Sequence, residues 1–559
     1  MGLSIRDGSL LDNPRNADTV RDMKAPVVLF GGQPLSPYAF QPLIQDRSAL
    51  TLAVERVRSF PHVSEVYLFL TDDIDEALLP SDCRVVRKKQ WTVLELLENL
   101  STVSEGQDLV YYAWADCPLL DPALSRTMVD RHLRWASEYT FADGWPYGFA
   151  PEILAPSTAA ILLSIYKNTL GSGNPQNSEN TTVPETRAEA VSRDALFQVL
   201  QKDINSFDIE TEISPVDLRS FRLTLAADSK RNHILLKGLI GAGLEAAEQA
   251  PSVLQAHPEL LRTLPAFYQI QVSRPCPQRC ALCPYPLFGD PTLPETGGTV
   301  NPADFMPLSS FQSLLDRIIE FSGDAVIDLS LWGEASLHPQ ITDLILAILE
   351  RPELSLIIET SGIGWTAIQL NLLAEVVRNR ALPRRGPNKL PPLNWIVSLD
   401  ARNPDRYREI RGAGYEEATH TAETLLKLFP GRTYVQAIRI KDAEDDIEQF
   451  YRYWKGRGAE VIIQKYDYFS SFLPQKRAGD ISPLLRQPCW HLMRDMVILL
   501  DGTVTLCKED VERGQILGNL FSEELEQIWQ RAQDRYLEQS RRSYTGICKD
   551  CDEYYTFNF

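Results

Sequence analysis

The chain has 559 residues, 44% of them hydrophobic, and a formal net charge of −19 at pH 7. A chain of this length predicts about three to four domains rather than a single core. The negative charge argues against nucleic acid as a partner, because a grip on the phosphate backbone needs clustered lysine and arginine. No apolar run of roughly 18 residues is present to span a bilayer, and the first residues lack the apolar stretch of a secretory signal. We therefore expect a cytoplasmic protein without a membrane partner.

Residues 26–160 contain short apolar runs and a segment whose apolar residues recur at helical spacing. The runs "APVVLFGG", "VSEVYLFLTDD" and "DLVYYAWADCP" predict strands, whereas "SALTLAVERVRSF" predicts a helix. This order is typical of an α/β domain with its loops at the strand C-termini.

A second alternation begins at "AFYQIQVSR", and its spacing of about 30 residues per β/α unit favours a parallel sheet or barrel. Near the C-terminus the pattern changes. There "DMVILLDGTVTLC" predicts a hairpin that turns at Asp-Gly, and "SEELEQIWQRAQDRYL" predicts a helix. We place the domains at residues 1–255, 256–480 and 481–559.

The nine cysteines are unevenly distributed: Cys83 and Cys117 are isolated, and seven lie in two groups after residue 270. In a reducing compartment, grouped cysteines indicate metal binding rather than disulfides. We interpret Cys117 as a small buried residue.

The first group is Cys276, Cys280 and Cys283, which form C-x3-C-x2-C directly after the strand predicted at "YQIQVSR". Thiolates at this spacing can converge on one soft metal centre, and three ligands leave a coordination position open. A closed zinc site is one alternative, but structural zinc takes four ligands, so a fourth would come from elsewhere. Three buried structural cysteines are the other alternative.

This motif, with Leu282 before the third cysteine, resembles the signature of the radical S-adenosylmethionine (SAM) enzymes. The resemblance implies a [4Fe-4S] cluster on Cys276, Cys280 and Cys283 whose remaining iron binds SAM. Reductive cleavage of SAM would then give a 5′-deoxyadenosyl radical that abstracts hydrogen from a substrate.

Two further stretches support this resemblance. "LWGEASLHP" resembles the Gly-Gly-Glu motif of that family, with Trp332 in place of the first glycine, and implies that Gly333 and Glu334 orient the SAM amino group. "VSLDA" supplies Ser398 and Asp400.

Arg411, in "YREIRGAG", follows at a spacing similar to that of the family. The resemblance implies that Ser398 and Arg411 hold the SAM carboxylate, a task that suits a hydroxyl and a guanidinium. Taken singly, each has an ordinary alternative, because such residues are often a helix cap or a solvated charge.

The second cysteine group is Cys489, Cys507, Cys548 and Cys551. Four thiolates without a vacancy could hold structural zinc or an iron-sulfur cluster. The surrounding "CW…LDGTVTLCKED…GQILGNL" resembles the SPASM/twitch extension of radical SAM enzymes, including Asp510. Because only four cysteines are available, the resemblance implies one auxiliary [4Fe-4S] cluster. With all four thiolates as ligands the cluster would transfer electrons, whereas with one of them not a ligand it could bind substrate directly.

The N-terminal region resembles nucleotide-sugar transferases of the cytidylyltransferase kind, in which an Asp-x-Pro-Leu acid, here Asp116, binds a divalent metal. Two departures stand against an active transferase. "FGGQPLSPYAFQPL" carries no lysine or arginine to cradle phosphates, and Asp228 is offset from the second acid of the family. We interpret the region as a degenerate domain that binds a sugar-like or nucleotide-like group, or a partner.

Together these features resemble the spiro-SPASM family. They predict an α/β protein with a partial (β/α)6 TIM-type radical SAM barrel, preceded by a nucleotide-diphospho-sugar-transferase-like domain and followed by a SPASM/twitch module. We expect a radical SAM enzyme acting on a peptidyl or carbohydrate-linked substrate, with flavodoxin or ferredoxin as electron donor. The sequence assigns no general acid or base. The alternatives are a nucleotidyltransferase with an accessory iron-sulfur tail and a non-catalytic iron-sulfur protein.

Overall fold

A computed structural model of the protein describes residues 23–32, 35–171, 191–288, 301–379, 390–441 and 443–556. The chain divides into two compact units. Unit 1 comprises Met1–Ala226 and Glu245–Glu248, and unit 2 comprises Ala227–Leu244 and Gln249–Phe559. Among the described helices, none is both long and apolar enough to cross a membrane.

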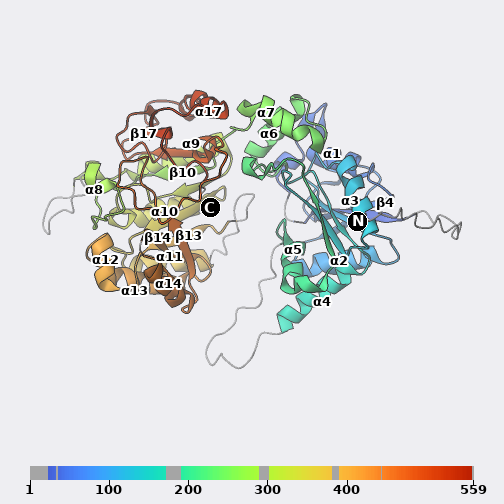
Figure 1. The fold of residues 1–559 in the computed structure, drawn as a ribbon, viewed down its shortest axis with the longest axis horizontal. Helices are drawn as coiled ribbons and strands as arrows, with labels where there is room; N and C mark the ends of the chain where they lie inside the picture. The colour runs from blue at the N-terminus through green and yellow to red at the C-terminus, as the bar shows by residue number, and fades with distance from the viewer. Residues whose placement is uncertain are drawn as a thin grey trace, which may run out of the picture. The chain divides into compact units, whose positions relative to one another are not determined.

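Unit 1, which Figure 1 draws mainly in blue to green, is built on a seven-stranded mixed sheet in the order β5-β4-β1-β6-β8-β7-β9. The strands are β1 (Ala25–Gly31), β4 (Val63–Thr71), β5 (Arg84–Lys88), β6 (Val110–Trp114), β7 (Tyr139–Asp143), β8 (Glu152–Leu154) and β9 (Ile209–Ile213), beside a small hairpin of β2 (Pro42–Ile44) and β3 (Arg47–Ser48). Only β8 runs antiparallel to its neighbours in the seven-stranded sheet. The helices are α1 (Ala49–Val57), α2 (Val93–Ser104), α3 (Pro122–Arg134), α4 (Thr158–Gly171) and α5 (Ala195–Leu200). The α/β prediction for this region is confirmed.

Unit 2 contains six parallel strands that are neighbours in the same order as in the chain (Figure 1). They are β10 (Phe267–Ile270), β11 (Ala325–Asp328), β12 (Leu354–Thr360), β13 (Leu393–Ser398), β14 (Thr433–Arg439) and β15 (Glu460–Lys465). The main helices between them are α9 (Leu308–Ser322), α10 (Ile341–Leu349), α11 (Ala367–Asn379), α12 (Pro404–Arg411), α13 (Tyr415–Leu428) and α14 (Glu444–Lys455). Three further helices of the unit are α6 (Lys230–Gly241), α7 (Ala250–Ala256) and α8 (Tyr285–Phe288). This repeated β/α order is the predicted partial (β/α)6 barrel.

The two faces of this sheet differ in chemistry because successive strand residues point to opposite faces. One face, which includes Tyr268 and Ile327, packs with the buried residues of the helices into the largest core of the unit. The opposite, inner face begins with an apolar layer of Phe267, Val326 and Ile357.

Toward the carboxyl ends of the strands, the inner face becomes polar. Five polar side chains, which we call the polar row, follow on adjacent strands: Gln269, Asp328, Glu359, Ser398 and Gln436. Register confirms that they are neighbours, since Gln269 pairs with Asp328 and Ser398 pairs with Gln436. The inner face therefore has an apolar floor beneath a hydrogen-bonding layer.

The C-terminal module continues the barrel sheet at its β10 edge. Strand β16 (Asp495–Ile498) pairs in parallel with β10, and β17 (Thr503–Thr505) and β18 (Ile516–Asn519) follow antiparallel. The predicted hairpin is therefore confirmed. Helix α15 (Trp490–Arg494) precedes it, and the helix predicted at 522–537 is instead two helices, α16 (Leu525–Gln530) and α17 (Gln533–Ser540). The helix is interrupted at Arg531 and Ala532, whose backbone N–H groups donate to carbonyls three residues earlier, not four as in an α-helix.

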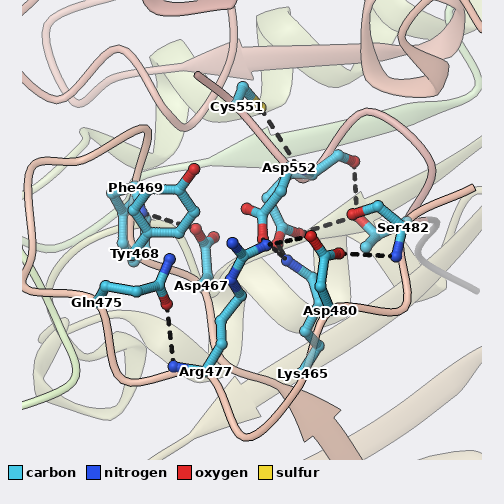
Figure 2. A network of polar contacts seen from close by, with 12 residues as sticks. Lys465, Asp467, Tyr468, Phe469, Gln475, Arg477, Asp480, Ser482, Cys551 and Asp552 are labelled. Carbon is cyan, nitrogen blue, oxygen red and sulfur yellow. Dashed lines mark hydrogen bonds and ion pairs between the residues drawn. The ribbon is translucent and has the colours of Figure 1, made fainter. Parts of the chain in front are cut away.

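The same module also contacts the opposite edge of the barrel. Lys465, the last residue of β15, forms ion pairs with Asp552 and Glu553, which follow Cys551, and Arg477 also pairs with Asp552 (Figure 2). The hydroxyl of Tyr468 donates to the carbonyl of Asp550. The C-terminal module thus joins the first and the last strand of the partial barrel.

Candidate functional site

The first cysteine group lies on the loop that follows β10, at the carboxyl end of the parallel sheet. The loop is fixed to α12, because the backbone N–H of Ala281 donates to the carbonyl of Ile410 at 2.7 Å. Burial raises the pKa of Cys276 and Cys283 to about 12, and the neighbouring thiol of Cys280 adds to this effect. The three thiols are close enough to influence one another electrostatically, and metal binding would have to displace their protons.

Arg411 lies beside this loop and connects it to the end of β13. Its Nε donates to Oδ2 of Asp400 at 2.6 Å, and its Nη1 donates to Oε1 of Gln278 at 3.1 Å. The same Nη1 lies 3.9 Å from Sγ of Cys280. The guanidinium and its partner carboxylate are both buried, with side-chain exposures of 11% and 2%. A buried cation therefore faces the cysteine loop.

Gly333 and Glu334 lie directly against the cysteine loop, in the connection after β11. Gly333 has a φ of +85°, and a Cβ at this position would come within 2.0 Å of the carbonyl oxygen of Ser273. The Glu334 N–H donates to the carbonyl of Pro275 at 2.8 Å. Only glycine allows this close approach of the two backbones.

The Glu334 carboxylate is buried and its position is fixed by the end of β12. The Thr360 hydroxyl donates to Oε1 at 2.6 Å, and the Ser361 N–H donates to Oε2 at 2.8 Å. An ionised carboxylate accepts up to about four hydrogen bonds, so Glu334 retains acceptor capacity for a ligand amino group.

Trp332, which replaces the first glycine of the Gly-Gly-Glu motif, adopts a φ of +42°. Aromatic packing holds it in this strained conformation: its ring stacks on Tyr285 and contacts Phe288 and Phe469. The substitution thus adds an apolar wall beside the cysteine loop, because Tyr285 follows Cys283 by two residues.

Ser398 and Arg411, which the sequence placed together, have different partners. The Ser398 hydroxyl donates to Oε1 of Glu359 at 2.7 Å, and Nε2 of Gln436 donates to the same oxygen at 2.6 Å. Ser398 is therefore hydrogen-bonded within the polar row, whereas Arg411, in α12, joins Asp400 to Gln278 of the cysteine loop.

The polar row continues toward β10. Nε2 of Gln269 donates to Oδ2 of Asp328 at 3.2 Å, and the Ser330 N–H donates to Oδ1 at 3.0 Å. Burial raises the pKa of Asp328 to about 6, and the nearby charge of Glu359 acts in the same direction. Sequence reasoning missed Gln278, which lies inside the cysteine motif, and all members of the polar row except Ser398: Gln269, Asp328, Glu359 and Gln436.

The second cysteine group surrounds a single pocket. Its lining includes four thiols, those of Cys489, Cys507, Cys548 and Cys551. Burial raises the pKa of all four thiols, and that of Cys489 to about 12.

Gln269 of the polar row lines this pocket as well. Glu509 lines it too, and its buried carboxylate lies 3.7 Å from Nζ of Lys508. The inner face of the barrel thus reaches the second cysteine group.

Both donor sets fit an iron-sulfur cluster. Each consists of buried or partly buried thiols, the soft ligands that iron-sulfur chemistry uses. Within the described residues, no group of three or more His, Cys, Asp or Glu side chains is arranged to hold one metal ion. A cluster, unlike one ion, distributes its thiolates over several irons.

Comparison with known proteins supports this assignment for the C-terminal module. The SPASM profile, described as an iron-sulfur cluster-binding domain, matches residues 489–552, a range that contains all four cysteines. A protein of Treponema pallidum (strain Nichols), described as an uncharacterized protein, is 40% identical over 371 residues, which are 65% of this chain and 98% of the relative.

Solved structures are more distantly similar. Streptococcus suis SuiB bound to the precursor peptide SuiA is 14% identical, with a TM-score of 0.38, over 71% of this chain and 84% of that chain. A cytidylyltransferase from Leptospira borgpetersenii is 18% identical, with a TM-score of 0.34, over 43% of this chain and 96% of that chain.

A C-x3-C-x2-C loop after the first strand of a six-stranded parallel partial barrel, followed by a SPASM domain, defines a radical SAM protein with a SPASM module. The chain belongs to the family of the Treponema pallidum protein, which it matches over nearly the whole length of that relative.

Proposed function

We propose that the protein is a radical SAM enzyme in which Cys276, Cys280 and Cys283 hold a SAM-binding [4Fe-4S] cluster. When bound, this cluster supplies the electron that cleaves SAM to a 5′-deoxyadenosyl radical, which abstracts hydrogen from the substrate. The observation that carries the proposal is the convergence of the three-thiol loop, Glu334 and the Arg411–Asp400 pair at one end of the sheet.

The chain's own residues then have distinct tasks. Glu334, fixed by Thr360 and Ser361, accepts from the SAM amino group. Arg411 positions the cysteine loop through Gln278 and is our candidate donor to the SAM carboxylate. Ser398 donates its only hydroxyl proton to Glu359, so holding the carboxylate through Ser398 would require this hydrogen bond to break.

The polar row is the surface that we propose for the substrate. It offers the carboxylates of Asp328 and Glu359 and the amides of Gln269 and Gln436, above an apolar floor. Such a layer matches a molecule rich in hydroxyl or amide groups, which supports the peptidyl or carbohydrate-linked class.

The second cysteine group holds, in this proposal, one auxiliary [4Fe-4S] cluster with four thiolate ligands. Because Gln269 belongs both to the polar row and to the lining of that pocket, the auxiliary cluster would lie next to a substrate on the inner face. A cluster held by these four thiols would supply an electron acceptor for the substrate, and flavodoxin or ferredoxin would be the external donor that reduces the first cluster.

The test is release of 5′-deoxyadenosine. The full chain is reconstituted anaerobically with iron and sulfide, its iron is counted, and SAM and dithionite are added. We expect 5′-deoxyadenosine from the wild type and from Cys83→Ala, a cysteine outside both groups, but none from Cys280→Ala. A fully loaded wild type that releases none would refute the proposal.

A further inference from the structure

Asp116 lies in the turn after β6 of unit 1, and its carboxylate is almost completely buried, with 2% of the residue exposed. In the transferases that this region resembles, the corresponding acid binds a divalent cation. Here both carboxylate oxygens are already engaged. Arg193 donates from Nη2 to Oδ2 at 2.7 Å and from Nη1 to Oδ1 at 3.1 Å.

Besides its ion pair with Asp116, the Arg193 guanidinium makes contacts with two aromatic rings. It lies over the ring of Trp114, the last residue of β6, at 4.6 Å, and over the ring of Tyr147 at 5.1 Å. Stacking on two aromatic rings restricts the planar group and favours its charged form. Although burial alone lowers the pKa of Arg193, the charge of Asp116 raises it well above its usual value.

We propose that Arg193 takes the place of the divalent cation, so that unit 1 binds no Mg²⁺ through Asp116 and performs no metal-dependent nucleotidyl transfer. A bidentate fork uses one lone pair on each carboxylate oxygen and keeps a positive charge beside them. A second cation would have to approach that charge in a buried setting, where screening by water is weak. Magnesium also demands several oxygen ligands in near-octahedral geometry, and a guanidinium offers none.

A fixed internal cation has a consequence that an exchangeable metal does not. Any ligand that unit 1 binds at this end of β6 meets a permanent arginine charge, so its binding is insensitive to chelators. Asp228, the other acid that the sequence singled out, accepts a hydrogen bond from the Asn232 side chain at 2.8 Å.

The experiment uses Mn²⁺ as a paramagnetic probe for the magnesium position. The full chain is titrated with Mn²⁺, and the free ion is followed by its EPR signal, for the wild type, Asp116→Asn, Arg193→Ala and Arg193→Lys. We expect identical curves for the wild type and Asp116→Asn, because Asp116 binds no metal in either. Arg193→Ala should gain one Mn²⁺ per chain, since it leaves a buried carboxylate without its cation, and Arg193→Lys should not.

Arg84→Ala is the matched control, because it removes an arginine from an exposed ion pair, with Glu65, in the same unit. It should bind no additional Mn²⁺. A wild type that binds one Mn²⁺, lost in Asp116→Asn, would overturn the inference, as would a folded Arg193→Ala without any gain. If Arg193→Ala does not fold, the comparison of the wild type with Asp116→Asn still decides.

The inference stands apart from the radical chemistry. All four variants should release 5′-deoxyadenosine at the wild-type rate, so failure of one proposal leaves the other intact.

Discussion

Lys465 Nζ lies 2.9 Å from Oδ2 of Asp552, and this contact joins the last strand of the barrel to the segment that follows Cys551. Both side chains are buried, with exposures of 13% and 9%. Figure 2 shows Arg477 and Asp480 lying beside them. The ion pair therefore forms part of the interface between the barrel and the cysteine-bearing end of the SPASM domain.

Lys465→Met should destabilise unit 2, because it removes the ammonium group that pairs with the buried carboxylates of Asp552 and Glu553. Breaking a buried ion pair by removing one partner costs about 3 kcal/mol. Urea denaturation measures the loss, and hydrogen exchange should show faster opening of β15 and of residues 548–553. Lys455→Ala is the control, because it removes an exposed lysine that pairs with Glu460 at the start of the same strand. Equal effects of the two variants would contradict this role of Lys465.

Arg411→Ala should lose both stability and iron. It leaves Asp400 as an unpaired buried carboxylate, which costs about 3 kcal/mol, and it removes the contact to Gln278 that positions the cysteine loop. Arg411→Lys restores the charge but not the fork, so we expect it to recover most of the melting temperature while SAM binding remains weak. Wild-type SAM affinity in Arg411→Lys would argue against carboxylate binding by Arg411.

Gly333→Ala should prevent assembly of the first cluster, because the added Cβ would collide with the Ser273 carbonyl. Gly458→Ala separates collision from backbone strain. Gly458 also has a positive φ, +79°, but no atom lies within 4 Å of the built Cβ. Strain alone costs about 1 to 2 kcal/mol, so Gly458→Ala should keep its iron. Absorbance near 400 nm and iron analysis compare the two, and an intact cluster in Gly333→Ala would rule out the close approach.

Asp328 makes stability depend on pH in a defined direction. Its folded pKa of about 6 lies above the ordinary value of 3.8, so the folded state holds the proton more tightly than the unfolded state. Stability from this group is therefore greatest at low pH and falls as pH rises from about 4 to about 6. Asp328→Asn should remove this fall. As the pH rises over this range, the free energy of unfolding of the variant should therefore increase relative to that of the wild type by on the order of 1 to 3 kcal/mol. Urea titrations at both ends of this range measure it, and a constant difference would refute the shift.

Two clusters predict about eight irons per chain, and loss of either cysteine group should leave about four. Cys551→Ala should therefore retain SAM cleavage while its iron falls by half, whereas Cys280→Ala should lose the cleavage. Iron analysis and EPR of the reduced protein distinguish the two. Unchanged iron in Cys551→Ala would indicate that this thiol is not a ligand.

Local features were predictable from the sequence, and long-range contacts were not. The strands of the barrel and the hairpin at Asp-Gly follow from periodicity and turn residues, which act over a few positions. The Ser398–Glu359 hydrogen bond joins residues 39 positions apart, and the Asp116–Arg193 pair joins residues 77 apart. Such pairs depend on how strands are ordered in the sheet, which spacing along the chain does not encode.

The helix predicted at 522–537 shows the same limit, because its apolar pattern continues through Arg531 while the backbone turns there. Likewise, the resemblance grouped Ser398 with Arg411, whereas hydrogen bonding divides them between the polar row and the cysteine loop.

The pairing of β16 with β10 determines how the protein can be divided. A fragment ending at residue 480 would expose the hydrogen-bonding groups of β10 along an open edge, and open edges recruit other chains. It would also leave Lys465 without either acid. We therefore expect such a fragment to aggregate, and domain-swap or chimera experiments should retain the barrel and its C-terminal module as one piece.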